Sequence, residues 1–207
     1  MFARRQFILI AIVVLFAAAA PALAEEGFKP LFDGRTLRGW KGDEKLWSVA
    51  DGAIVGTTDD ATLQHNSFLA TEKTYKNFVL KVKFKLRNGN SGIQYRSKSF
   101  PDHVVKGYQA DIAEKMFMGI LYEEGGRGIL ANVEADEVSK HVKKDDWNEY
   151  VITADGPHIT QVLNGFTTVD YTEKSEEGAT DGIIALQLHV GPKMRVWFKD
   201  IEVRELP

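Results

Sequence analysis

Three stretches of alternating sequence carry polar side chains of the kinds that bind ligands or transfer protons. On an extended strand, residues two apart lie on one face, so each stretch separates a polar pair from apolar neighbours. The pairs are Gln94 with Arg96 in 92–97, Gln109 with Asp111 in 108–113, and Gln187 with His189 in 183–190. They supply amides, a guanidinium, a carboxylate and an imidazole, whereas a merely solvated face favours lysine and threonine.

Glycine-rich connections accompany these polar pairs. Asn90-Ser91-Gly92 precedes the first pair, and the run 125–128 contains three glycines around Arg127. Glycine lets a backbone or a ligand approach closely. Tyr122, Glu123 and Glu124, just before the second run, can line the rim of a pocket, although a pair of glutamates beside a turn is more often simply solvated. The alternative is that all these residues are ordinary outward-facing polar groups on surface strands.

The elements that must position these residues are predicted to be almost entirely β-strands. In 78–87 apolar residues alternate with Lys81, Lys83, Lys85 and Arg87, which predicts a strand with one face in the core. Asp51-Gly52, Asn164-Gly165 and Asp155-Gly156-Pro157 predict tight turns. Alternation slips near 199–200, as at a β-bulge. Further strands are predicted at 47–49, 54–56, 92–97, 108–113, 119–123, 149–154, 159–163, 166–169, 183–190 and 194–203.

Many short strands joined by such turns predict a β-sandwich or jelly roll. Only 133–144 can hold a short helix, and it can equally be a loop. Residues 25–45 are expected to wrap along the domain as an opening segment.

The N-terminal 24 residues have the pattern of a cleavable signal peptide. Arg4 and Arg5 precede an apolar run over 7–20, and Ala22-Leu23-Ala24 supplies the small residues before a cleavage site. The run is shorter than the roughly 20 residues that span a bilayer. We therefore expect residues 25–207 to be one exported domain, periplasmic or secreted, with no stable membrane insertion after cleavage.

The composition of this mature chain excludes some classes of partner. Without Arg4 and Arg5, 24 of the 26 basic side chains remain beside 29 acidic ones, a formal charge of −5. A nucleic-acid partner is not expected, because such proteins carry a basic surface. The chain has no cysteine, so packing must stabilise it without disulfides.

The chain resembles the 3-keto-disaccharide hydrolase family along nearly the whole of 25–207. The resemblance is carried by Leu31-Phe32-Asp33-Gly34, Trp40, Asn77-Phe78-Val79-Leu80, Asn90-Ser91-Gly92-Ile93, Gly107-Tyr108-Gln109-Ala110-Asp111-Ile112, Gly119-Ile120-Leu121-Tyr122, Trp147-Asn148-Glu149-Tyr150, Leu163-Asn164-Gly165 and Phe198-Lys199-Asp200-Ile201. It implies an all-β, concanavalin A-like jelly-roll sandwich of two antiparallel sheets with the site on a concave sheet. Many members have Glu and Gln where this chain has Gln109 and Asp111.

The resemblance also implies a small carbohydrate substrate, a glycoside oxidised to a ketone at C3. Such a glycoside is cleaved by removal of the C2 proton, β-elimination and hydration. We expect His189 as the base, with Asp111 orienting it or acting as the base itself. The expected supporting groups are Gln94, Arg96, Gln109 and Gln187 on the sugar, Glu123 or Tyr122 at the leaving group, and Arg127 on the far sugar. A divalent cation at Asp111 and His189 is an alternative to the donors at the C3 oxygen.

Three alternatives to this chemistry are recognisable from the sequence. Residues 109–114 are similar to the Glu-x-Asp-x-x-Glu motif of jelly-roll β-glucanases, but Gln109 replaces the nucleophilic glutamate, and an amide cannot attack an anomeric carbon. A lectin-like carbohydrate-binding module would use the same face without chemistry. A protein-interaction domain would use it without binding sugar.

Overall fold

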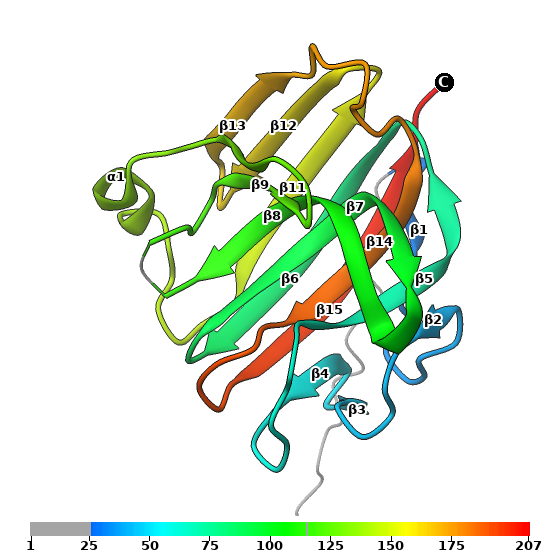
Figure 1. Cartoon of the computed structure of the whole chain (residues 1–207), viewed down its shortest axis with the longest axis vertical. Coiled ribbons are helices and arrows are strands. Elements are labelled where there is room, and N and C mark those ends of the chain that lie inside the picture. Colours follow the sequence, from blue (N-terminus) through cyan, green and yellow to red (C-terminus); the bar gives the residue numbers. More distant parts are fainter. Residues whose placement is uncertain (1–25, 115) are drawn as a thin grey trace, which may run out of the picture.

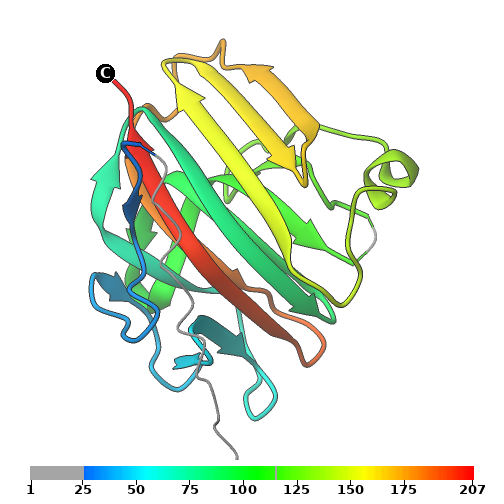
Figure 2. The ribbon, with the colours of Figure 1, turned by 180° about the vertical axis from the view of Figure 1, so that it is seen from behind.

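The computed structural model describes residues 26–114 and 116–207, which form two packed antiparallel sheets (Figure 1). Sheet A contains β1 (Lys29–Pro30), β3 (Trp47–Ala50), β4 (Ala53–Thr57), β6 (Phe78–Arg87), β11 (Asn148–Asp155), β12 (His158–Leu163), β13 (Phe166–Thr172) and β15 (Arg195–Glu205). Its order is β13-β12-β11-β6-β15-β4-β3, with β1 beside β15, as Figure 2 shows from behind.

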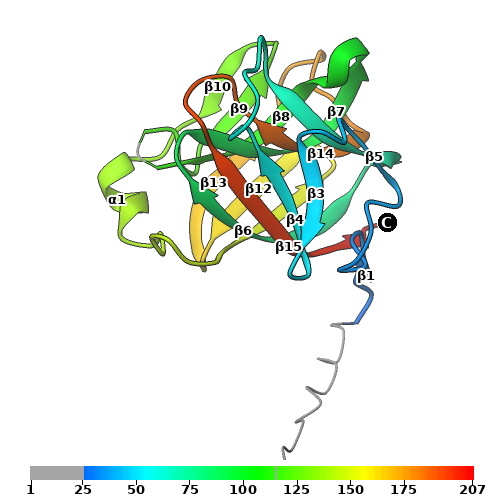
Figure 3. The same ribbon diagram turned by 90° about the horizontal axis from the view of Figure 1, so that it is seen from below.

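Sheet B carries the three polar pairs. It contains β2 (Trp40–Lys41), β5 (Ser67–Tyr75), β7 (Asn90–Phe100), β8 (Val104–Ala113), β9 (Leu121–Glu124), β10 (Gly128–Ala131) and β14 (Gly182–Leu188). Its order is β10-β9-β8-β7-β14-β5-β2. The two-sheet, all-β prediction is confirmed. Figure 3 shows the layers from below, with α1 (Ala135–Ser139) and β1 on opposite sides.

The core between the sheets follows from strand alternation. Phe78, Leu80, Val82 and Phe84 of β6 are buried. They meet residues of sheet B such as Ile93, Tyr95, Tyr108, Ile112 and Leu186 in one apolar cluster. Burial of this apolar area is the main favourable term in folding. Because side chains alternate between the two faces of a strand, the sequence neighbours of these residues lie on the outer face of sheet B.

The predicted turns and the predicted bulge occur where expected. Asp51 and Asn164 adopt positive φ angles in the hairpins β3–β4 and β12–β13. The β15–β6 register shifts between Lys199 and Glu202, which confirms the slip in alternation. The segment 133–144 contains the short helix α1.

Four strands, β1, β2, β5 and β10, were not predicted, and β5 matters for the outer face of sheet B. β5 pairs with β14, and β10 pairs with β9. The connection between β7 and β8 contains the 3₁₀ turn η1 (Pro101–His103) and bends across toward β5 (Figure 1). Val105 there packs in a second apolar cluster with Phe68, Ala70, Ile183 and Ala185. The hairpin therefore covers part of the outer face.

The opening segment runs along both sheets, as expected. Its β1 pairs with β15 of sheet A, and its β2 pairs with β5 of sheet B. The predicted signal peptide, residues 1–24, lies outside the described residues. Among the residues that are described, no helix has the length and apolar character needed to cross a membrane.

Arg96 does not share a face with Gln94, so that prediction is wrong. The β7–β8 register shifts between Tyr95 and Lys98, and Arg96 has a φ of 47°. A Cβ on Gly107 or Gly182, the glycines on the flanking strands, would lie 2.4 Å from an atom of Ser97. The bulge reverses the side chain, as bulges do.

The Arg96 guanidinium instead joins β7 to the β5–β6 connection and to the β11–β12 turn of sheet A. It donates hydrogen bonds to the carbonyl oxygens of Lys76 and Gly156, each at 2.7 Å, and to Asn77 Oδ1 at 3.1 Å. The residue is 2% exposed. Arg96 therefore stabilises the fold and does not line the outer face of sheet B.

Replacing Arg96 by methionine should therefore lower the free energy of unfolding. Hydrogen bonds from a charged donor contribute about 1.5–3 kcal/mol each when one partner is removed, so we expect a loss of roughly 3 kcal/mol or more. Lys98→Met, at an exposed position of the same strand, is the matched control and should change stability by less than about 0.5 kcal/mol. Urea unfolding measures both. Equal stability of the two variants would contradict this role.

Candidate functional site

Gln94, Gln109, Asp111 and Gln187 lie together on the outer face of sheet B. Gln94 is opposite Gln109 across β7 and β8, and Ala185 is opposite Gln94 across β7 and β14. Gln187, two residues after Ala185, is on the same face. Gly92 is opposite Asp111, and a Cβ there would lie 2.4 Å from Cδ of Gln109. The missing side chain at Gly92 lets the Gln109 amide lie across β7.

The Asp111 carboxyl group is at the centre of this face. Its oxygens accept hydrogen bonds from Asn90 Nδ2 and Gln109 Nε2, each at 3.3 Å. The residue is 5% exposed. Burial, with a smaller contribution from the negative charge of Glu124, raises the pKa of Asp111 to about 7, although the two amide hydrogen bonds act in the opposite direction. Asp111 can therefore exchange a proton near neutral pH.

A second carboxylate, Glu124 of β9, reaches the same face. It accepts hydrogen bonds from Asn66 Nδ2 at 3.2 Å and from Gln187 Nε2 at 3.4 Å. Asn66 precedes β5 and accepts a hydrogen bond from the Val190 amide. Glu124 thus connects the edge of sheet B to the ends of β5 and β14.

Three amide oxygens around these carboxylates are buried without a donor. They belong to Asn90, Gln94 and Gln187. Gln94 donates to Gln109 Oε1 at 3.2 Å, and Gln187 donates to Glu124, so the nitrogen of each amide is used and its oxygen is not. A buried acceptor without a donor costs about 1–3 kcal/mol. A ligand that presents hydroxyl or N–H donors would recover this cost.

His189 lies just beyond the end of β14 and is only half-buried. Its Nδ1 is 2.5 Å from the Val190 carbonyl oxygen, so Nδ1 donates and Nε2 is left as the basic nitrogen. His189 and Asn90 line a cavity of about 230 Å³ that also touches Met194. Because Asn90 also binds Asp111, this cavity opens beside the polar cluster.

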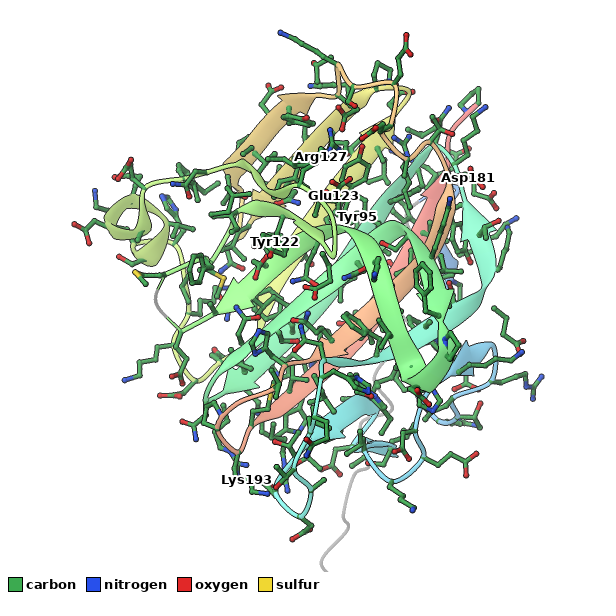
Figure 4. The ribbon with its side chains drawn as sticks, viewed as in Figure 1. Tyr95, Tyr122, Glu123, Arg127, Asp181 and Lys193 are labelled. Atoms are coloured by element: carbon green, nitrogen blue, oxygen red, sulfur yellow. The ribbon has the colours of Figure 1, made fainter. Side chains whose placement is uncertain are left out.

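Glu123 and Arg127, expected at the leaving group and the far sugar, are not on this face. Glu123 is opposite Tyr108, whose ring is in the core, whereas Tyr122 is opposite Gln109 and shares its face. Arg127 lies beside Glu123 (Figure 4) and donates to it at 2.7 and 3.0 Å. It also donates to Glu173 at 2.7 Å. The placement predicted for these two residues is wrong.

Arg127, Glu123 and Glu173 form an ion-pair cluster, called the clamp below, that joins the edges of the two sheets. Hydrogen bonds from Arg127 hold the pKa of Glu123 below its usual range and that of Glu173 at about 2. Glu173 also accepts from Tyr108 Oη at 2.6 Å. The clamp fixes the β9–β10 turn and so the position of Glu124.

Sequence reasoning missed Asn66 and Asn90 as members of the site, and it named Glu124 only as a residue that can line the rim of a pocket. Alternation from Tyr122 would have placed Glu124, and not Glu123, with Gln109. Asn90 was noted only for its glycine-rich context. Asn66 precedes an unpredicted strand, and no local pattern marks it.

Within residues 26–114 and 116–207, no three histidine, aspartate or glutamate side chains group so that they could hold a metal ion. The divalent cation expected as an alternative at Asp111 and His189 stays a prediction. A larger cavity of about 630 Å³ lies between the end of β6 and the α1 segment, with Phe84, Met118 and Val138 in its wall. None of Asn90, Gln94, Gln109 and Gln187 lines this larger cavity.

Comparison with known proteins places the chain in a carbohydrate context. The sequence pattern of the 3-keto-alpha-glucoside-1,2-lyase-like domain matches residues 27–204. No curated protein matches the chain.

Solved structures share the fold. A protein from Parabacteroides distasonis, provisionally described as a glycosyl hydrolase, is 24% identical, with a TM-score of 0.67 over 87% of this chain and 95% of the other. A second protein from the same organism and with the same description is 25% identical, with a TM-score of 0.64 over 86% and 99%. The carbohydrate-binding module CBM66 from Bacillus subtilis is 14% identical, with a TM-score of 0.62 over 81% and 96%.

The raised pKa of Asp111 predicts a specific dependence of stability on pH. Its folded value, about 7, exceeds the ordinary 3.8. Between these values the folded protein retains a proton that the unfolded chain has lost, so stability falls as pH rises through this window. Asp111→Asn removes the titration. The variant should be more stable than the wild type by roughly 2–4 kcal/mol at about pH 8, and the difference should disappear toward pH 4.

Urea unfolding across this pH range measures the effect. Asp60→Asn, at an exposed position, is the control and should follow the wild type. An Asp111→Asn variant less stable than the wild type above neutral pH would show that the carboxylate is not buried at a cost.

Proposed function

Because the chain belongs to the family of 3-keto-alpha-glucoside-1,2-lyase-like domains, we propose that it cleaves glycosides whose sugar is oxidised to a ketone at C3. The family and the glycosyl hydrolase-like structures support a carbohydrate-active function. The site of cleavage is the outer face of sheet B, around Asp111.

The reaction needs a base at C2, a hydrogen-bond donor at the C3 oxygen and a proton donor at the leaving oxygen. A ketone at C3 acidifies the proton at C2. The base removes this proton, and the electron pair forms an enolate through C2 and C3. The enolate expels the oxygen at C1, so that the C1–O bond breaks and the leaving oxygen takes up a proton. Water then adds across C1 and C2, its hydroxyl going to C1 and a proton to C2.

Asp111 is the proposed base, and its environment is the observation that carries the proposal. A general base is most effective when its pKa is near the working pH. Asp111 has this property because it is buried and its hydrogen-bond partners in the described part of the chain are amides. His189, at the mouth of the adjoining cavity, passes the proton to solvent through Nε2.

The amides around Asp111 suit a polyhydroxylated ligand. The donor-less oxygens of Asn90, Gln94 and Gln187 accept hydroxyl protons of the sugar. Each glutamine amide nitrogen has a second N–H, and one of these polarises the C3 oxygen. Tyr122, on the face of Gln109, donates a proton near the leaving group.

Retaining hydrolysis by a pair of carboxylates at 109–114 is a weaker proposal. Gln109 cannot be the nucleophile. Glu114, at the position of the acid, is exposed just beyond β8 and accepts a hydrogen bond from the Asn88 amide.

We also propose that the domain is exported, because the first 24 residues have the pattern of a signal peptide. N-terminal sequencing of the protein recovered outside the cytoplasm should begin at or near Glu25. An intact Met1 in that fraction would contradict the proposal.

Asp111→Asn should reduce kcat/KM on a 3-keto-glucoside by at least about a hundredfold, the usual contribution of a general base. Since the ionised carboxylate is the base, wild-type kcat/KM should rise with pH through about 7. Asp60→Asn should retain wild-type activity. Release of 3-keto-glucose measures both variants.

Two results would contradict the proposal. A rate that falls as pH rises through this range would make Asp111 an acid. Binding of the sugar by the wild type with no product, with divalent cations supplied, would identify a lectin-like module.

A further inference from the structure

Asp111 and Glu124 share one face, and neither has an ion-pair partner among residues 26–114 and 116–207. The hydrogen-bond partners of both are amides, from Asn90, Gln109, Asn66 and Gln187. In the part of the chain that the structure describes, no lysine or arginine forms an ion pair with either. The negative charge of Glu124 is felt at Asp111, where it disfavours ionisation.

Three described cations on neighbouring parts of sheet B are engaged elsewhere. Arg96 binds carbonyl oxygens of sheet A, and Arg127 binds Glu123 and Glu173. The Lys106 side chain lies against Gly125, but its Nζ is 5.2 Å from the centre of the Phe100 ring. None of these three described cations neutralises the face, so the cationic group of a ligand can supply the positive charge.

The buried glutamines show that the outer face of sheet B lacks hydrogen-bond donors in addition to carrying two carboxylates. Gln187 is fully buried, and it donates to Glu124 while its own oxygen has no donor. Gln94, also fully buried, has the same unused oxygen. Carboxylates and unused amide oxygens together form a set of acceptors, which a group with several N–H donors satisfies best.

We propose that Asp111 and Glu124 form a subsite for an ammonium group, so that the protein prefers amino sugars and rejects sugars bearing a carboxylate, sulfate or phosphate. An ammonium carries three donors and one positive charge, and it complements two carboxylates that lack a counter-ion. An anionic sugar would place a third negative charge on a poorly solvated face, where like charges repel strongly.

This inference rests on the proposed sugar site but not on the cleavage chemistry. It can therefore be tested with unreactive ligands of the same shape. Methyl glucosaminide carries an ammonium in place of the C2 hydroxyl of methyl glucoside, and methyl glucuronide carries a carboxylate in place of its C6 hydroxymethyl group. Calorimetric titration near neutral pH and low salt compares their affinities.

We expect the wild type to bind the glucosaminide at least about tenfold more tightly than the glucuronide, with the glucoside between them. Glu124→Gln should remove most of the difference between glucosaminide and glucoside. Glu176→Gln, at an exposed position outside the clamp, removes the same charge; it is the matched control and should keep the preference.

The other possible results separate failure of the ammonium subsite from failure of the proposed function. Equal affinity for the three ligands, or tightest binding of the glucuronide, overturns the ammonium subsite even if a 3-keto-glucoside is cleaved. Loss of the preference in Glu176→Gln would show only a long-range charge effect and also overturns it. If no ligand binds and no 3-keto-glucoside is cleaved, the proposed function fails as well.

Discussion

The carboxyl group of Asp111 is withdrawn from water with no ion-pair partner among the described residues, and the organisation of the site depends on this constraint. An isolated buried carboxylate is costly, so the group binds a proton more tightly than it would in water. The surrounding amides lower this cost only partly. The protein thus spends some stability on a group that can take up and release a proton near neutral pH, as functional sites often do.

The two sheets hold the Asp111 backbone firmly while its side chain titrates. Tyr150 of sheet A donates from Oη to the Asp111 carbonyl oxygen at 2.8 Å, and its ring stacks on Phe84 in the core. The Asp111 amide and carbonyl also pair with Ile120 and Gly119 beyond the loop that leads into β9. The clamp of Arg127, Glu123 and Glu173 fixes the other end of β9, which carries Glu124. Both carboxylates are therefore positioned by contacts that reach the core or the opposite sheet.

Much of this arrangement could be predicted from local sequence. Alternation in 92–97, 108–113 and 183–190 identified Gln94, Gln109, Asp111 and Gln187, because residues two apart on an unbroken strand must share a face. It failed at Arg96, where a bulge depends on glycines of two other strands that no local pattern reveals. It also failed for Glu123, which was chosen over Glu124 although parity with Tyr122 favours the latter. The partners of Arg127 lie on both sheets, and only the tertiary structure brings Glu173 to it.

The central claim is that Asp111 is a buried carboxyl group with a near-neutral pKa, and ¹³C NMR of its side-chain carboxyl carbon tests this directly. Assignment is secured by the signal that Asp111→Asn removes. The structure predicts a titration midpoint of about 7. A midpoint near the ordinary aspartate value of 3.8 would mean that water or an unrecognised cation solvates the group, and both the base and the ammonium subsite would lose their physical foundation.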